Sequence, residues 1–211
     1  MNFSEFSKIR HDQRLSTQKA DLSDKNHFYN KLKLLKKDDT FFHSVSDFSS
    51  RIESQNYNHG KLTTAQYMSH PYRVATRVLE YFPDADEDYI KLALCHNIIE
   101  LSVVSDSLSD YIGSEMMDYV RVLTVDRNVQ WDLSYKASYY ASLGEHKITR
   151  VIKVFDKLDN LFTLCDNSDR DIKFMYLREI ELNIMPIVLQ DMPFLEDYFS
   201  CIIKINFDLL N

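Results

Sequence analysis

Glycine and proline are scarce in this chain: of its 211 residues, only three are glycine and four are proline. The tight turns of β-rich and dinucleotide-binding folds depend on these residues, so their scarcity favours helices. Gly60, Gly113 and Gly144 are too far apart to form a glycine-rich phosphate-binding loop. The sequence therefore excludes P-loop and Rossmann-type nucleotide sites and predicts an all-α protein.

The chain also lacks long apolar runs, a basic excess and an even number of cysteines. No apolar run reaches the roughly 18 residues that span a bilayer. The formal net charge of −7 argues against a general nucleic-acid binder, which needs a basic surface. Cys95, Cys165 and Cys201 lie in apolar stretches, which indicates reduced, buried thiols. With no signal peptide at the N-terminus, these features predict a cytoplasmic protein that binds neither membranes nor nucleic acids.

The apolar spacing divides the chain into two regions. Residues 1–40 are polar and predict one or two short helices that form an N-terminal appendage. Residues 41–211 have regular helical spacing and predict a compact domain of seven or more helices. The expected helices there include 70–82 with Pro71 in its first turn, 88–101, 132–144 closed by Gly144, 149–164, 170–188 ended or kinked by Pro186, and about 193–209.

Two of these helices carry clear apolar faces. In the first, Val74, Val78 and Leu79 share one side. The helix 149–164 has a continuous stripe of Val151, Val154, Phe155, Leu158, Leu161, Phe162 and Cys165. Opposite the stripe stand Lys153, Asp156 and Asn160. Their spacing favours a face exposed to solvent. The same spacing would also suit a binding site, so spacing alone does not decide between the two.

The stretch "KLALCHNIIEL" places His96, Asn97 and Glu100 in an otherwise apolar helix. In one interpretation, His96 is a core histidine bonded to a neighbouring carbonyl, and the other two residues face water. Because the surrounding positions are apolar, little of this helix can face water, and a buried carboxylate without a partner costs several kcal/mol. In the other interpretation, the three polar groups share a metal ion or a hydrated cleft. His70, considered alone, reads as part of a helix N-cap region.

Four segments in order resemble the motifs of HD-domain phosphohydrolases. They are "QYMSHPYRVA", "LALCHNIIEL", "IGSEMMDYVRVLT" and "IKVFDKLDNL", and they resemble the family patterns "PYxxHPxxVA", "AALLHDxxED", "FGxxVxxLVxxLT" and "IKLADRLHNM". The resemblance covers about residues 48–190. It is closest to the hydrolase domain of RelA/SpoT-type alarmone enzymes and their small single-domain relatives. It implies an HD-domain-like helical bundle that uses Mn²⁺ to remove the 3′-pyrophosphate from guanosine tetraphosphate or pentaphosphate.

The resemblance also assigns roles to individual residues. His70, His96 and Asp156 match three metal ligands of the family, and Asn97 stands where the fourth, an aspartate, is usual. Glu100 matches the first acid of the pair that handles the attacking water. A hard cation such as Mn²⁺ prefers carboxylates together with imidazoles, which explains these residue types. Asn97 keeps an oxygen but removes a negative charge, so weaker metal binding is expected.

The same comparison predicts the substrate-binding residues. Lys153 and Asn160 match polar residues that line the family's cleft. The loop "NHGKLTTAQY" matches the family's nucleotide-binding loop, which is normally rich in arginine and lysine. His59, Lys61 and Tyr67 are what remains of it here. The implied ligand is therefore a small nucleotide or another phosphorylated molecule.

Two departures leave the function open. Asn97 replaces an acid, and Leu101 replaces the second acid of the water-handling pair. One hypothesis is a divergent metal-dependent phosphohydrolase in which Glu100 and Asn97 are the catalytic residues. The alternative is an inactive pseudo-hydrolase that binds a nucleotide or a protein partner. A helical scaffold without any site is a third reading, which the four ordered motifs disfavour.

Overall fold

The computed structural model describes residues 22–35, 38–55, 64–101, 104–164, 167 and 169–210. Within these ranges the chain forms helices and no β-strand, which confirms the predicted all-α class. The chain divides into two compact units, the N-terminal unit Met1–Tyr139 and the C-terminal unit Tyr140–Asn211. None of the described helices is long and apolar enough to cross a bilayer.

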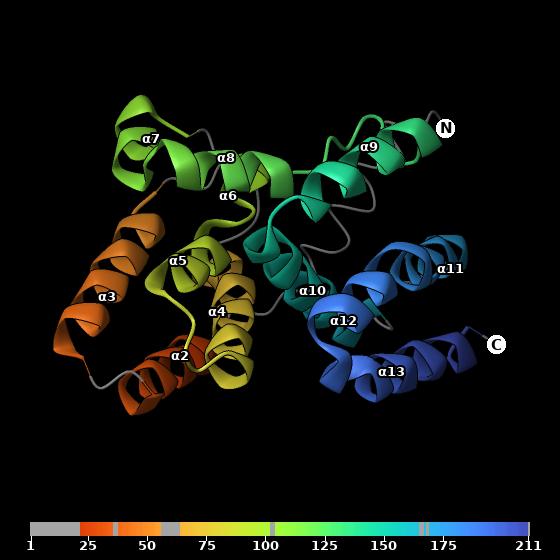
Figure 1. Ribbon diagram of the computed structural model, residues 1–211, viewed down its shortest axis with the longest axis horizontal. Helices are drawn as coiled ribbons and strands as arrows, with labels where there is room; N and C mark the ends of the chain where they lie inside the picture. Colours follow the sequence, from red (N-terminus) through yellow and green to blue (C-terminus); the bar gives the residue numbers. More distant parts are fainter. Residues whose placement is uncertain are drawn as a thin grey trace. The chain divides into compact units, whose positions relative to one another are not determined.

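The N-terminal unit is built from helices of very different lengths, and the division between the two units falls inside the last of them. α4 packs against both α2 and α5, and α3 packs against α5 (Figure 1). Its described helices are α2 (Leu22–Leu35), α3 (Asp39–Glu53), α4 (Thr64–Tyr81), α5 (Glu87–Cys95), α6 (Ile98–Leu101), α7 (Asp106–Ile112), α8 (Ser114–Leu123) and α9 (Leu133–Gly144).

Helix α2 contributes to the core of this unit. Phe28 and Leu32 are fully buried, and the Phe28 ring lies 5.3 Å from that of Tyr72 on α4. The predicted boundary between residues 40 and 41 falls inside α3, which begins at Asp39. On α4, the predicted apolar face is present, because Val74, Val78 and Leu79 are all fully buried.

Helix α4 begins earlier than predicted. The expected start near Pro71 was wrong, because the helix starts at Thr64 and Pro71 lies inside it. A proline there removes one backbone hydrogen bond and strains the preceding turn. The turn before it brings Tyr67 and Met68 into the core, where they are 2% and 0% exposed. Their burial offsets the cost of the internal proline and places His70 in mid-helix rather than in an N-cap region.

The continuous helix predicted over 88–101 is also wrong. α5 ends at Cys95, a turn follows at His96 and Asn97, and α6 begins at Ile98. The Glu100 amide bonds back to the Asn97 carbonyl, which restarts the helix within one turn. Two of the three polar residues of the stretch, His96 and Asn97, therefore lie at a break between helices.

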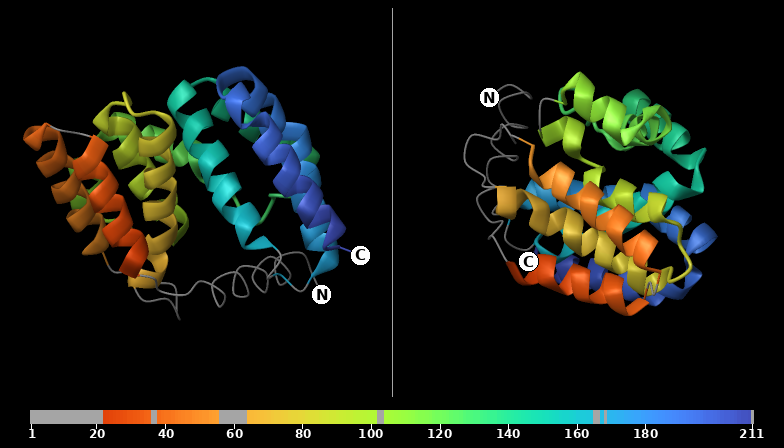
Figure 2. Two further views of the ribbon diagram at one scale, coloured as in Figure 1. Left: turned by 90° about the horizontal axis from the view of Figure 1, so that it is seen from below. Right: turned by 90° about the vertical axis from the view of Figure 1, so that its left-hand side faces the viewer.

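The C-terminal unit has α10 as its most buried helix. α10 packs against α12 and α13, and α11 packs against α13 (Figures 1 and 2). After the end of α9, its described elements are α10 (Lys147–Phe162), α11 (Arg170–Glu179), the π-helical η2 (Ile180–Ile184), α12 (Met185–Asp191), the 3-10 helix η3 (Pro193–Leu195) and α13 (Glu196–Asp208). The interruption before Pro186 confirms that the predicted helix 170–188 breaks near this proline.

Most residues of the predicted apolar stripe on α10 are buried, but one is exposed. Val151, Val154, Phe155, Leu158 and Leu161 are buried, as predicted. Phe162, however, is 45% exposed, because the helix ends there. Among the thiols, Cys95 is buried and Cys201 on α13 is exposed, so the prediction of a buried Cys201 was wrong. Cys165 lies outside the described residues.

Side-chain caps and one glycine define several helix ends. Asp38, Ser105 and Asp169 accept hydrogen bonds from backbone amides in the first turns of α3, α7 and α11. Gly113 joins α7 to α8 with φ of 88°, a conformation that other residues rarely adopt. The capping role predicted for Gly144 was wrong, since Gly144 is the last helical residue of α9.

Candidate metal centre

His70 and His96 face each other within the N-terminal unit. Their Nε2 atoms are 3.2 Å apart, and both residues are buried, with 2% and 4% exposure. His70 comes from α4 and His96 from the break between α5 and α6. Two nitrogens bound to one ion at roughly 2.1 Å, with an angle of 90° to 109°, lie about 3.0 to 3.4 Å apart. The observed separation fits two neighbouring ligands of one cation.

The second ring nitrogen of His96 explains its orientation. His96 Nδ1 lies 2.8 Å from the carbonyl oxygen of Ala93. Because a carbonyl oxygen only accepts, this bond places the proton on Nδ1 and leaves the lone pair on Nε2. That lone pair points toward His70. The predicted bond from a core histidine to a neighbouring carbonyl is therefore present, and it prepares the other nitrogen for a metal.

Asn97 and Tyr67 are hydrogen-bonded to each other. The Tyr67 hydroxyl donates to Oδ1 of Asn97 at 2.7 Å. Tyr67 is 2% exposed, whereas Asn97 is half-buried at the helix break. The oxygen predicted to be a metal ligand thus already accepts one hydrogen bond and keeps a second lone pair. Tyr67, expected in a substrate-binding loop, is instead a core residue of α4.

Glu100 is held by the segment that follows α8. Its Oε1 accepts from the Val125 amide at 3.0 Å. Its Oε2 accepts from Arg127, from Nη2 at 2.5 Å and from Nε at 3.1 Å. The Glu100 side chain is only 11% exposed, so the interpretation in which Glu100 faces water was wrong. Nothing in the sequence pattern indicated Arg127, because its partner is 27 residues earlier.

In the C-terminal unit, Asp156 is bracketed by two residues of its own helix. Its Oδ1 accepts from Asn160 at 2.7 Å, and its Oδ2 is 3.0 Å from the Lys153 ammonium. Lys153, Asp156, Lys157 and Asp159 are all buried, with exposures of 4% to 8%. The solvated face that spacing favoured for this side of α10 was therefore wrong.

Lys157, next to Asp156, has a perturbed pKa. Burial lowers the pKa of this ammonium to about 8, although Glu179 at 2.8 Å opposes the shift. The Tyr176 ring lies 4.5 Å from the Lys157 nitrogen, and the Tyr140 hydroxyl donates to the same Glu179 oxygen. Lys157 is thus part of a buried polar cluster within the C-terminal unit.

Three of the predicted ligands are buried and offer atoms of a kind that binds metal ions. These are the imidazole nitrogens of His70 and His96 in the N-terminal unit and a carboxylate oxygen of Asp156 in the C-terminal unit. Carboxylate and imidazole ligands suit several divalent metals, so this set does not select one. Of the other predicted site residues, His59 and Lys61 lie outside the described residues.

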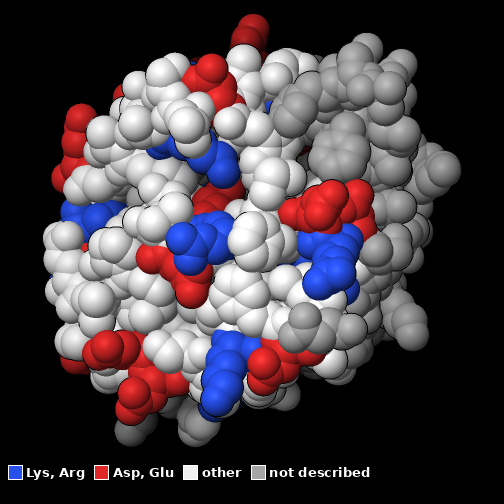
Figure 3. Space-filling view, turned by 90° about the vertical axis from the view of Figure 1, so that its right-hand side faces the viewer, with Lys and Arg blue, Asp and Glu red and all other residues white. Residues whose placement is uncertain are grey.

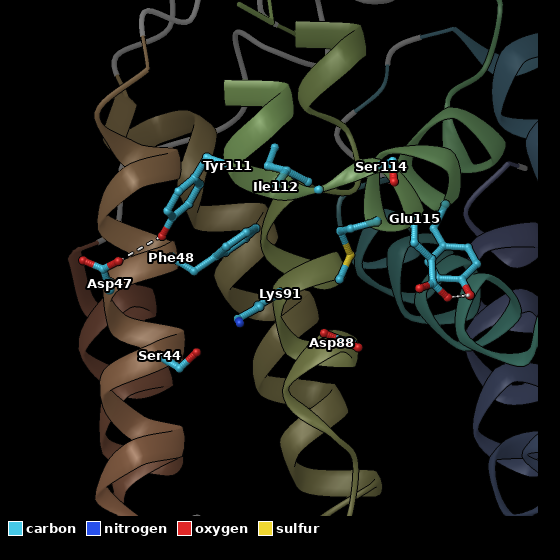
Figure 4. A pocket seen from close by; sticks show the side chains of 12 residues that line it. Ser44, Asp47, Phe48, Asp88, Lys91, Tyr111, Ile112, Ser114 and Glu115 are labelled. Carbon is cyan, nitrogen blue, oxygen red and sulfur yellow. Dashed lines mark hydrogen bonds between the residues drawn. The ribbon is translucent and has the colours of Figure 1, made fainter. Parts of the chain in front are cut away.

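A surface hollow elsewhere in the N-terminal unit contains none of the predicted site residues. It has a volume of about 420 Å³ and lies among α3, α5, α7 and α8 (Figure 4). Its polar rim is paired internally: Tyr111 bonds to Asp47, and Lys91 pairs with Glu87. The Ser44 hydroxyl and Lys91 lower the pKa of Glu87. Neither His70 nor His96 lines this hollow.

Charged side chains are mixed on the face shown in Figure 3. Among its coloured residues, lysines and arginines alternate with aspartates and glutamates, and no continuous basic strip forms. Nucleic-acid backbones are bound by clustered basic residues.

No known protein-family model matches the chain, and no curated protein matches it. The resemblance to HD-domain phosphohydrolases therefore depends on the four motifs alone. Family membership stays a prediction, whereas the histidine pair is a structural observation.

Proposed function

We propose that this protein is a divergent metal-dependent phosphohydrolase that acts on a nucleotide or a related phosphate ester or pyrophosphate. The motifs imply that His70, His96 and Asp156 hold the divalent cation and that this ion is Mn²⁺. The observation that carries this proposal is the 3.2 Å separation of the two Nε2 atoms. Two buried imidazoles so oriented need either a shared proton or a shared cation between them.

The chemistry of the three side chains supports the cation. His96 presents a lone pair, because its proton is on Nδ1. Asp156 supplies negative charge and carboxylate oxygens, which divalent cations bind. A bound divalent cation would stabilise negative charge on phosphoryl oxygens and make water a stronger nucleophile.

Lys153 and Asn160 have defined roles in this proposal. Asn160 donates to Asp156 and so orients its carboxylate. Lys153 pairs with the other oxygen and, as a buried ammonium, supports the negative charge of Asp156 or of a phosphate. Both residues would therefore hold the third ligand in place. The same positive charge would let Lys153 bind a phosphate group of the substrate.

A second candidate is a pseudo-hydrolase that binds a phosphorylated ligand without cleaving it. It is favoured by Glu100, the residue expected to handle water, because its carboxylate is bonded to Arg127 and to the Val125 amide. Asn97 adds no negative charge. The two histidines can thus bind a ligand, whereas the carboxylate expected to handle water is already hydrogen-bonded to other residues.

Metal titration combined with a hydrolysis assay tests both candidates. We would measure Mn²⁺ binding by calorimetry and phosphate or pyrophosphate release across a nucleotide panel that includes guanosine tetraphosphate. The variants are His96→Ala, Asp156→Asn and, as a control, His43→Ala on the exposed side of α3. Hydrolysis that needs Mn²⁺ and is lost only in the first two variants is expected. Mn²⁺ binding without hydrolysis would favour the second candidate, and no binding at millimolar Mn²⁺ would contradict both the metal centre and the hydrolase.

A further inference from the structure

Arg127 forms an ion pair with Glu100, the predicted catalytic carboxylate. Two of its nitrogens bond to one oxygen of Glu100, at 2.5 and 3.1 Å, and the Val125 amide bonds to the other oxygen at 3.0 Å. We call these three bonds the Glu100 clamp. This carboxylate accepts three hydrogen bonds, two of them from a permanently charged guanidinium, so it is poorly placed to take a proton from water.

The segment that carries Arg127 is held independently of Glu100. Arg127 Nη1 donates to the side chain of Gln130, whose amide donates back to the Arg127 carbonyl. The side chain of Asp126 accepts from the backbone and side chain of Asn128, and its own amide donates to Tyr135. Arg127 would therefore keep its place if Glu100 were released.

Arg127 also remains accessible to a ligand. Its side chain is 38% exposed, whereas that of Glu100 is 11% exposed. A guanidinium binds carboxylates and phosphates through the same paired N–H geometry. A phosphate brings more negative charge and more acceptor oxygens than one carboxylate, so it can compete for the same donors. The exposed edge of Arg127 is where such competition would begin.

We propose that Arg127 is a phosphate-binding switch for the proposed centre. A phosphorylated ligand takes Arg127 from Glu100, and the carboxylate then also leaves the Val125 amide and becomes available as a proton acceptor. This inference rests on the proposed function, because it assigns regulation to the same site. It explains how a hydrolase can have its catalytic Glu100 paired with Arg127. In the resting protein Glu100 stays in this pair, and it is released only when a phosphorylated ligand binds.

The unmodified protein tests the switch directly. Inorganic pyrophosphate is the probe, and its binding is first followed to saturation by calorimetry. Hydrogen exchange of the Val125 amide is then measured with and without it. Since the amide loses a bond to a charged acceptor, exchange should become about tenfold faster at saturation. Unchanged exchange at saturation, or no pyrophosphate binding at all, would overturn the proposal.

Variants test the competition between carboxylate and phosphate. Glu100→Gln removes the competing charge, so pyrophosphate should bind about tenfold more tightly. Arg127→Met should weaken binding and abolish this gain in the double variant. The matched controls are Asp118→Asn and Arg121→Met, which alter the exposed Asp118–Arg121 pair on α8. Equal affinity in Glu100→Gln and Asp118→Asn would contradict the switch.

The outcomes separate this inference from the proposed function. If the protein binds Mn²⁺ and hydrolyses a nucleotide while the Val125 amide stays protected, only the switch fails. If pyrophosphate releases that amide but no substrate is hydrolysed with Mn²⁺, the hydrolase proposal fails and the phosphate-binding role of Arg127 stands. Thermal melts of each variant show whether it is folded.

Discussion

The hydroxyl of Tyr67 donates a 2.7 Å hydrogen bond to Oδ1 of Asn97, which joins α4 to the break between α5 and α6. Tyr67 is almost fully buried, so this bond fixes the orientation of the amide. Oδ1 therefore faces a donor, and the Asn97 NH₂ points elsewhere. An aspartate could accept the same bond without moving the backbone.

The first prediction concerns Asn97→Asp. The variant adds a negative charge beside the histidine pair while keeping the acceptor for Tyr67. One charge a few Å away contributes on the order of 1 to 4 kcal/mol, so Mn²⁺ affinity should rise at least about fivefold. Calorimetric titration of the purified variant measures this change.

The control for this prediction is Asn128→Asp, which adds the same charge on an exposed turn after α8. It should leave Mn²⁺ affinity unchanged within about twofold, because exposed charges are screened. If both variants bind Mn²⁺ equally well, the histidine pair is not next to the metal.

Local pattern predicted most helices because each carries its own apolar face. Val151, Val154 and Leu158 repeat at helical spacing and are buried. The start of α4 was missed because Pro71 usually marks a first turn, whereas here the burial of Tyr67 outweighs that preference. The outcome depended on tertiary packing, which local spacing does not encode.

Residue identity predicted that His70 and His96 lie together, and the structure adds how they are oriented. His70 and His96 were expected as ligands of one ion, and their Nε2 atoms do face each other. The partners of Glu100 were not foreseen, because Val125 and Arg127 are 25 and 27 residues away in the sequence. No helical periodicity relates residues so far apart, so this contact needed the folded structure.

The second prediction concerns metal-dependent stability. A ligand at 100 times its dissociation constant stabilises the folded state by about 2.7 kcal/mol. Mn²⁺ should therefore raise the melting temperature, and EDTA should reverse the rise. Protons compete with the metal for imidazole nitrogens, so the stabilisation should be smaller at pH 6 than at pH 7.5. Differential scanning calorimetry with and without EDTA measures it.

His70→Ala should lose this Mn²⁺-dependent stabilisation, and His43→Ala should keep it, because His43 is exposed on α3. A stabilisation by Mn²⁺ that survives in His70→Ala would place the metal at another site.

The third prediction concerns the ion pair between Arg150 and Asp191 in the C-terminal unit. Two bonds, at 2.5 and 3.1 Å, join α10 to α12, and the side chains are only 13% and 8% exposed. Arg150→Met would leave a buried carboxylate unpaired. The free energy of unfolding should fall by about 3 to 5 kcal/mol in urea titrations.

Two comparisons make this result specific. Arg178→Met removes half of an exposed pair with Glu181 and should cost less than about 1 kcal/mol. The double variant Arg150→Met with Asp191→Leu should recover much of the loss, because no buried charge is then left. Similar losses for Arg150→Met and Arg178→Met would show that the buried pair contributes no more than a surface one.

The fourth prediction follows from the lowered pKa of Lys157. Its pKa is about 8 in the folded protein and near 10.5 in the unfolded chain, because burial disfavours the ammonium. Below pH 8 both states hold the proton, and the folded state is destabilised by the buried charge. Between pH 8 and 10.5 the folded state releases a proton that the unfolded chain keeps, so stability from this group rises with pH.

Lys157→Met removes that titration with little change in volume. Relative to this variant, the wild-type protein should gain at most about 2.5 kcal/mol of unfolding free energy between pH 7 and pH 10. Urea titrations at each pH, with EDTA present so that no metal contributes, measure the difference. Lys147→Met, at the exposed start of α10, should run parallel to the wild type. If Lys157→Met also runs parallel, Lys157 keeps an ordinary pKa in the folded protein, and its burial is relieved by Glu179.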